Sequence, residues 1–181
     1  MERKTKMKRF LALVLAAALT LSLAGCESIK NGVASLMGAN TAQEADTENW
    51  AVATTDPIML PEGTNATAQW TNVVSGGTLY GVYNGIWKRN TGYFQVSGDT
   101  LTITACGTAE GPQEYKIALW KKVDGGAQYV NGSTGYFHTD GTNYRYTITG
   151  LDPSAQYRIT VSYDSSRYYL YGMFSAEGIA G

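Results

Sequence analysis

The arrangement of aromatic and β-branched residues constrains this chain most. Every one of the 13 tyrosines lies between Tyr80 and Tyr171. Alternation with a period of two recurs in this part of the chain over residues 100–105, 115–120, 144–148 and 157–163. Successive side chains of a strand point to opposite faces of a sheet, so this pattern predicts antiparallel strands with one face buried.

Turn signals separate these segments. They are Gly98-Asp99, Gly111-Pro112, Asp124-Gly125-Gly126, Asp140-Gly141 and Asp164-Ser165-Ser166. A spacing of about 8–12 residues or a little more is typical of a sandwich or a jelly roll. Asn84-Gly85 predicts a further hairpin over residues 80–88, because Asn-Gly supplies both positive φ values of a type I′ turn. The sequence therefore predicts an all-β antiparallel sandwich over residues 67–181.

One connection carries a family resemblance. Leu151, Pro153 and Tyr157 stand in a segment that resembles the passage from strand E to strand F of fibronectin type III domains, and residues 115–117 resemble the tyrosine-led strand C. The resemblance covers about residues 92–181. It implies an immunoglobulin-like β-sandwich in which the last strand lies beside residues 157–163. The family's strand B tryptophan is missing here, and a jelly roll with more strands stays open as the alternative.

The first 25 residues have the pattern of an export signal. Basic residues at positions 3, 4, 6, 8 and 9 stand against the single acid Glu2, and an uncharged, mostly apolar run follows over residues 10–23. This run is shorter than the roughly 20 residues that a spanning helix needs. Residues 1–25 are therefore predicted to be a signal peptide that is removed.

The run ends in Leu23-Ala24-Gly25-Cys26, which resembles the lipobox of bacterial lipoproteins. The resemblance implies cleavage before Cys26 and lipid, such as palmitate, on its sulfur. Two or more acyl chains give a durable anchor, whereas one chain does not. The expected location is the extracytoplasmic face of a cell membrane. The alternative is an ordinary signal peptide that has a cysteine near its end.

Residues 26–66 read as a flexible acidic linker. Their composition is polar, with Trp50 as the only aromatic residue, and six acids lie between Glu27 and Glu62. Such a segment cannot bury enough apolar surface to fold by itself. From Thr67 onward eight basic residues balance eight acids, so the chain lacks the basic footprint of a nucleic-acid-binding protein. Once Cys26 carries lipid, Cys106 has no partner in the chain and is either an inert strand residue or an exposed thiol.

Catalytic patterns are sparse. His138 is the only histidine, which leaves no two-histidine metal site and few pairs of a nucleophile and a base. Most acids after Thr67 stand in Asp-Gly, Gly-Asp, Asp-Pro or Asp-Ser contexts, where Asp forms turns. We therefore assign no catalytic residue, metal or cofactor. An envelope hydrolase of unrecognised type, using His138 or turn carboxylates, remains the alternative function.

The aromatic residues suggest a binding surface. Alternation sends Trp120 to the outer face of its strand, and Arg158 would lie outward on the neighbouring strand. The last strand is apolar on both faces, so a row that contains Tyr169 and Tyr171, or the alternating row of Tyr168 and Leu170, would also face outward. We assign Trp120, Arg158, Tyr169 and Tyr171 to one platform.

The competing interpretation is that residues 83–87 cover this face and make the aromatic residues core. With the platform exposed, the sequence favours a membrane-anchored, non-catalytic β-sandwich that binds a polysaccharide or an envelope protein.

Overall fold

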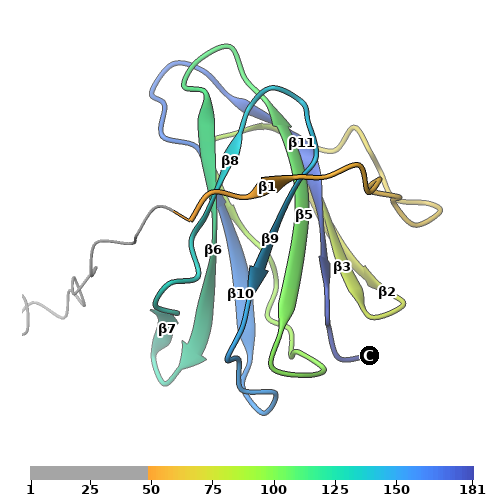
Figure 1. The fold of residues 1–181 in the computed structure, drawn as a ribbon, viewed down its shortest axis with the longest axis vertical. Helices are drawn as coiled ribbons and strands as arrows, with labels where there is room; N and C mark the ends of the chain where they lie inside the picture. Colours follow the sequence, from red (N-terminus) through yellow and green to blue (C-terminus); the bar gives the residue numbers. More distant parts are fainter. Residues whose placement is uncertain (1–48) are drawn as a thin grey trace, which may run out of the picture. The chain divides into compact units, whose positions relative to one another are not determined.

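The computed structural model describes residues 49–181. The predicted signal peptide and the lipidation site at Cys26 lie outside the described residues. The described part of the chain forms eleven strands (Figure 1): β1 Val52–Ala53, β2 Trp70–Ser75, β3 Thr78–Ile86, β4 Lys88–Asn90, β5 Leu101–Thr108, β6 Glu114–Val123, β7 Gly126–Tyr129, β8 Gly135–His138, β9 Tyr144–Ile148, β10 Tyr157–Ser162 and β11 Leu170–Glu177. Across residues 49–181, no helix is long and apolar enough to cross a membrane.

The strands form two antiparallel sheets packed face to face (Figure 1). One sheet has six strands in the order β1-β9-β5-β11-β3-β2, and the other has five, in the order β4-β10-β6-β7 with β8 also paired to β6. Four pairs are nested along the chain, namely β3 with β11, β4 with β10, β5 with β9 and β6 with β8. This nesting across two sheets is the connectivity of a jelly roll. The predicted all-β sandwich is confirmed, in the form of its jelly-roll alternative.

The core lies between the two sheets and follows the predicted alternation. Ile117 and Leu119 of β6, Ile159 and Val161 of β10, and Phe174 of β11 are fully buried. Burial of one such side chain stabilises the fold by roughly 1.5–3 kcal/mol. The ring of Phe174 lies directly over Gly81 of β3, where a Cβ atom would overlap it. Close packing therefore requires glycine at position 81.

The turn predicted at Asn84-Gly85 is wrong. Strand β3 runs through both residues, and the hairpin between β2 and β3 turns instead at Gly76-Gly77, whose φ angles are +57° and +76°. Gly85 has φ +81° and is an extra residue between the pairs that Asn84 and Ile86 make with β11. It therefore forms a β-bulge, because a positive φ serves a bulge as well as a turn.

The neighbours of β10 also differ from the fibronectin order. The E-to-F passage exists as expected, since β9 and β10 lie in opposite sheets and the Asp152 N–H donates to the Tyr157 hydroxyl at 2.9 Å. Strand β10 pairs with β6 and β4, however, and β11 pairs with β5 and β3 in the other sheet. The prediction that the last strand lies beside residues 157–163 is therefore wrong.

Part of the predicted linker belongs to the sandwich. Strand β1 pairs with β9, the Ala51 N–H donates to the Tyr136 carbonyl at 2.9 Å, and Arg145 forms an ion pair with Asp56. Ala51 is buried. A linker over all of residues 26–66 is therefore wrong for its last part, where Val52 and Ala53 pair with a sheet edge although the segment has no periodicity of its own.

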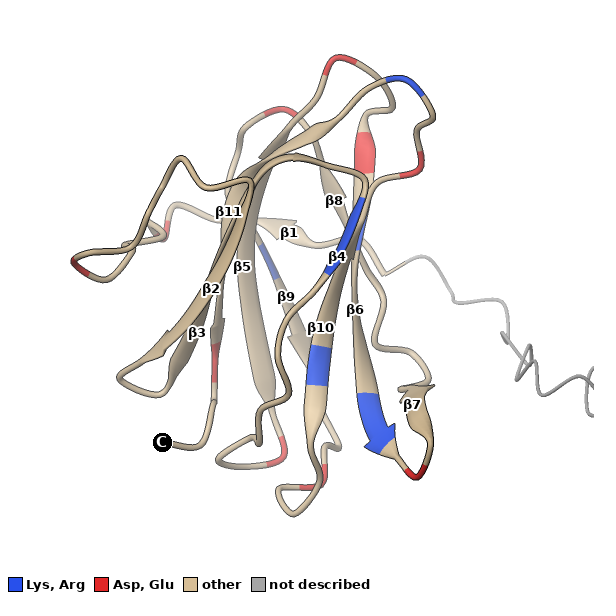
Figure 2. Ribbon diagram, turned by 180° about the vertical axis from the view of Figure 1, so that it is seen from behind, with Lys and Arg blue, Asp and Glu red and all other residues tan. Residues whose placement is uncertain are grey.

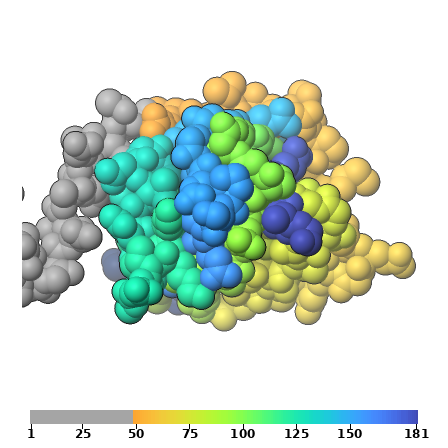
Figure 3. Space-filling view, turned by 90° about the horizontal axis from the view of Figure 1, so that it is seen from below, coloured from red at the N-terminus to blue at the C-terminus, as the bar shows by residue number. Residues whose placement is uncertain are grey.

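The two ends of the sandwich carry different loops. At the lower end, the β6–β7 turn, the β9–β10 loop, the residues just before β5 and the C-terminal residues follow one another across the surface (Figure 3). The loops after β5 and before β11 lie at the opposite, upper end (Figure 1). The jelly-roll connectivity thus brings two segments that are distant in sequence to the upper end.

Candidate functional site

The structure separates the four residues that were assigned to one platform. Trp120 and Arg158 are cross-strand neighbours on the outer face of the five-stranded sheet. Tyr169 and Tyr171 lie at the start of β11, which belongs to the other sheet. The single platform is therefore wrong, because it depended on placing the last strand beside β10. Two clusters take its place.

The first cluster, the sheet face, consists of Tyr93, Trp120, Lys122, Tyr129 and Arg158. Trp120 and Tyr129 meet edge to face with ring centroids 5.6 Å apart. The ammonium group of Lys122 and the guanidinium of Arg158 lie over the Tyr93 ring, at 5.4 Å and 5.7 Å from its centroid. Charge of one sign and aromatic rings therefore share this surface.

Trp120 is less exposed than the platform required. It points outward, as the alternation predicted, but it is half-buried and its indole nitrogen is out of contact with solvent. Tyr129 packs against it from β7. The competing prediction, a cover from residues 83–87, is wrong as well, since Tyr83 and Ile86 are buried in the core and Trp87 is 43% exposed.

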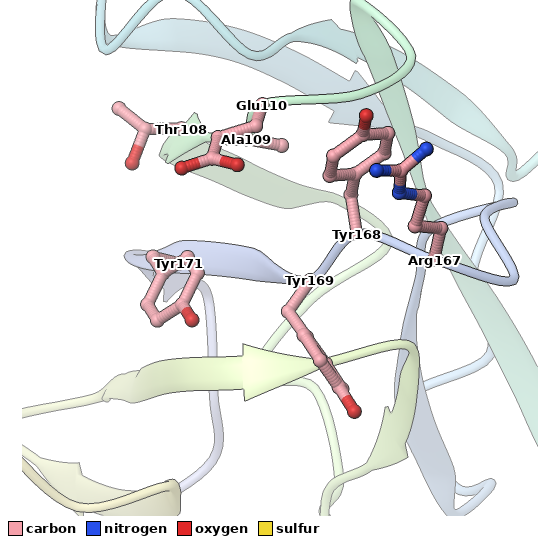
Figure 4. Close-up of a pocket in the computed structure, with 7 residues that line it drawn as sticks. All are labelled: Thr108, Ala109, Glu110, Arg167, Tyr168, Tyr169 and Tyr171. Atoms are coloured by element: carbon pink, nitrogen blue, oxygen red, sulfur yellow. The ribbon is translucent and has the colours of Figure 1, made fainter.

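The second cluster is a pocket at the upper end of the sandwich, which we call the end pocket. It has a volume of about 410 Å³. The lining residues are Thr108, Ala109, Glu110, Arg167, Tyr168, Tyr169 and Tyr171. Thr108 and Glu110 lie on one side and the rings of Tyr169 and Tyr171 on the other (Figure 4). The pocket therefore joins the end of β5 to the start of β11.

Three aromatic rings at or beside the end pocket are exposed to solvent. Tyr169 stacks on Trp87 with centroids 4.5 Å apart and ring planes within 16°. The exposed fractions are 43% for Trp87, 42% for Tyr169 and 47% for Tyr171. The ring of Tyr171 lies against Gly85, the bulge residue of β3. Large rings exposed together in a soluble domain are characteristic of binding surfaces.

Backbone contacts hold these rings in place. The Trp87 indole N–H donates to the Tyr168 carbonyl at 2.8 Å, which ties β11 to the end of β3. The Ser165 hydroxyl accepts the Tyr168 N–H at 2.9 Å. The Tyr168 ring packs on Gly111, where a Cβ atom would collide with it. These contacts restrict the rotation of the pocket's aromatic side chains, and preorganised side chains lower the entropic cost of binding.

The end pocket has charged side chains of both signs. Glu110 and Arg167 are exposed at its rim, and the Arg167 guanidinium lies 5.3 Å from the centroid of Tyr168. A carboxylate accepts hydrogen bonds and a guanidinium donates them. Together with exposed rings, such a pair suits a ligand with many hydroxyl groups and apolar ring faces. Sequence reasoning assigned neither Arg167 nor Glu110 to a binding surface.

His138 lies outside both clusters. It stacks on Trp50 with centroids 4.6 Å apart and meets Tyr144 edge to face at 5.3 Å. Among residues 49–181, no hydrogen bond joins His138 to a hydroxyl or carboxylate group, as a catalytic triad would require. The environment of His138 is that of a packing residue.

Asp140, two residues beyond His138, is held as a carboxylate. The Thr142 N–H and then the Tyr144 hydroxyl, the latter at 2.8 Å, donate to it and lower the pKa of Asp140 below its usual value. A lowered pKa suits an acceptor and opposes a role as a proton donor near neutral pH. Within the described residues, no three His, Cys, Asp or Glu side chains are grouped so that they could hold a metal ion.

Cys106 is half-buried on β5, opposite Met173 of β11. Burial raises the pKa of its thiol, so the group stays protonated at neutral pH. Its backbone carbonyl accepts a hydrogen bond from the buried Tyr83 hydroxyl at 2.8 Å. These contacts favour the inert strand residue over the reactive thiol.

Comparison with known proteins shows no family. No protein-family model matches the chain, and no curated protein matches it. A solved structure titled "CBM4 structure and function" is 15% identical, with a TM-score of 0.34 over 61% of this chain and 73% of its own. The CBM36-1 domain of a multidomain xylanase from the hindgut metagenome of Trinervitermes trinervoides is 17% identical, with a TM-score of 0.34 over 62% and 85%. At these values the likeness carries no argument about ligands.

Proposed function

We propose that this chain presents a non-catalytic β-sandwich module that binds carbohydrate in the end pocket. The observation that carries the proposal is the stacked pair of Trp87 and Tyr169 near Tyr171. All three rings are more than 40% exposed, the two tyrosines line the pocket, and Trp87 lies beside it. Sugar rings have apolar faces that stack on aromatic rings, and their hydroxyl groups exchange hydrogen bonds with Glu110 and Arg167. A few polar groups beside apolar walls are the usual composition of a small-ligand site.

The test is a binding screen with the full-length protein against soluble neutral polysaccharides, such as xylan, mannan and cello-oligosaccharides. Tyr169→Ala and Tyr171→Ala should each weaken binding of a ligand from this screen at least tenfold, on the order of 1.4 kcal/mol, because each variant removes a stacking surface. Tyr93→Ala is the matched control, since Tyr93 is 39% exposed and lies on the sheet face. A screen without any ligand, or end-pocket variants that bind like the original protein, would contradict the proposal.

Placement of the module at the outer face of a membrane belongs to the same proposal. It is supported by the motif Leu23-Ala24-Gly25-Cys26 and by the export pattern before it. Cys26→Ser should release the protein from the membrane fraction, because the thioether that carries the lipid cannot form. Mass spectrometry of the N-terminal peptide should show acyl chains on Cys26 only in the original protein. A Cys26→Ser variant that stays in the membrane fraction would contradict the proposed lipid anchor.

A further inference from the structure

The two sheets differ in how they distribute charge. Strands β4, β6 and β10 of the five-stranded sheet contain six basic residues, Lys88, Arg89, Lys116, Lys121, Lys122 and Arg158, and one acid, Glu114. The six-stranded sheet contains only Arg145 and Glu177. Figure 2 shows basic positions along β4, β10 and β6, whereas the acids lie mainly in loops. Four of these basic residues, Lys88, Lys116, Lys122 and Arg158, share the outward register of Trp120, so this near-neutral domain has one cationic face.

Part of this charge is neutralised within the chain. Lys116 pairs with Asp164 at 2.7 Å and Lys121 with Asp152 at 3.3 Å. No ion pair among residues 49–181 involves Lys122 or Arg158. These two cations lie over the same Tyr93 ring, and the Lys122 ammonium donates to the neutral Gln156 side-chain amide oxygen at 2.8 Å. The cationic centre of the sheet face therefore has no carboxylate partner from the described chain.

Four of the five residues of the sheet face lie in one row across the strands, and Lys122 lies two residues from this row on β6. Phe94 pairs with Tyr157, which places Tyr93 opposite Arg158. Arg158 pairs with Trp120, and Trp120 pairs with Tyr129. Three inter-strand steps span roughly 14 Å at 4.7–4.9 Å each. Such a row is long enough to follow an extended polymer.

We propose that the sheet face is a second binding site, which takes a carboxylate-bearing polysaccharide such as a polyuronate. A sugar carboxylate can accept hydrogen bonds from the Arg158 guanidinium and the Lys122 ammonium, and these charge-assisted bonds are about twice as strong as neutral ones. The partly exposed Tyr93 ring adds apolar contact surface beside these two cations. This site is independent of the end pocket, which has both an acid and a base at its rim.

The test compares polygalacturonate with its fully methyl-esterified form, which has the same backbone without the charge. The full-length protein should bind polygalacturonate and bind the ester at least tenfold more weakly. Binding should also fall several-fold between 20 and 200 mM NaCl, because salt screens exposed charges. Equal binding of the two polymers, or no binding of either, would overturn the proposal. Equal binding of single-stranded DNA would also overturn it by showing an attraction to any polyanion.

Variants locate the site. The double variant Lys122→Gln/Arg158→Gln should lose at least tenfold in affinity for polygalacturonate. Lys122→Gln alone should lose several-fold in affinity for polygalacturonate. Because Lys122 is exposed, this single variant should still fold if the double variant does not. Arg167→Gln is the matched control and should bind polygalacturonate like the original protein. A folded Lys122→Gln variant with unchanged affinity would overturn the proposal, and Tyr169→Ala, which tests the end pocket, should leave polygalacturonate binding intact.

Discussion

The end pocket and the sheet face both combine aromatic rings with charged side chains, but they differ in the exposure of the rings and in the sign of the charge. At the end pocket, Tyr169 and Tyr171 are 42% and 47% exposed, and charges of both signs surround them. On the sheet face, Trp120 and Tyr129 are half-buried and only cations accompany them at the centre. The comparison shows that an outward-pointing aromatic residue can serve stability as well as binding. Exposure separates these two roles, and the sign of the nearby charge separates the ligands that we propose for the two regions.

The sharpest way to break this comparison is to truncate one tryptophan in each region. Trp120→Ala should lower the free energy of unfolding by about 2–3 kcal/mol, less than a fully buried tryptophan, because its ring packs against Tyr129 and its neighbouring strand. Trp87→Ala should cost about 1 kcal/mol, since it loses an exposed stack and one hydrogen bond. Urea unfolding of both variants measures the difference. Equal losses in the free energy of unfolding would show that Trp120 and Trp87 contribute equally to stability, which would contradict the comparison.

A second change concerns the bulge that supports Tyr171. Gly85→Ala should lower the stability by about 1–2 kcal/mol, because alanine is strained at φ +81°. It should also weaken neutral-sugar binding, since Tyr171 lies against Gly85, while polygalacturonate binding stays unchanged. Gly63→Ala is the matched control, with φ +80° and no neighbouring atoms at its Cβ position. If Gly63→Ala weakened sugar binding equally, the bulge would have no special role at the pocket.

The smallest effect is expected for Lys116 of β6, whose charge is balanced by Asp164. The hydrogen bond that the Lys116 ammonium donates to the Asp164 carboxylate is the main cause that raises the pKa of Lys116. The stabilisation is therefore fully present below pH 10.5, and it is lost as the pH rises through the raised pKa. Lys116→Gln should cost less than about 1 kcal/mol, as exposed ion pairs do.

The same variant should bind polygalacturonate nearly like the original protein, because Asp164 already balances Lys116. Thermal unfolding and binding titrations measure the two effects. A tenfold loss of polygalacturonate affinity in Lys116→Gln would extend the cationic site beyond Lys122 and Arg158.

Local signals predicted the strands well. The alternation over residues 144–148 coincides with β9, and Tyr157 opens β10 as expected. Asn84-Gly85 gave a wrong turn prediction, because a glycine with positive φ can form a β-bulge as well as a turn. The hairpin turn is formed by Gly76-Gly77 instead. The pairing of β11 depends on contacts between distant segments, which periodicity does not encode. The sequence therefore identified Trp120, Arg158, Tyr169 and Tyr171 as surface candidates but could not predict that they form two groups.

The most direct test of two separate sites uses the four tryptophans as reporters. Full-length protein containing 5-fluorotryptophan gives one fluorine NMR signal for each, and Trp→Phe variants assign the signals. A neutral oligosaccharide found by the screen should shift the signal of Trp87 and leave that of Trp120 in place, whereas polygalacturonate should shift Trp120 and spare Trp87. If both ligands shifted the same tryptophan, or if no sugar shifted Trp87, the division into an end pocket and a sheet face would be contradicted.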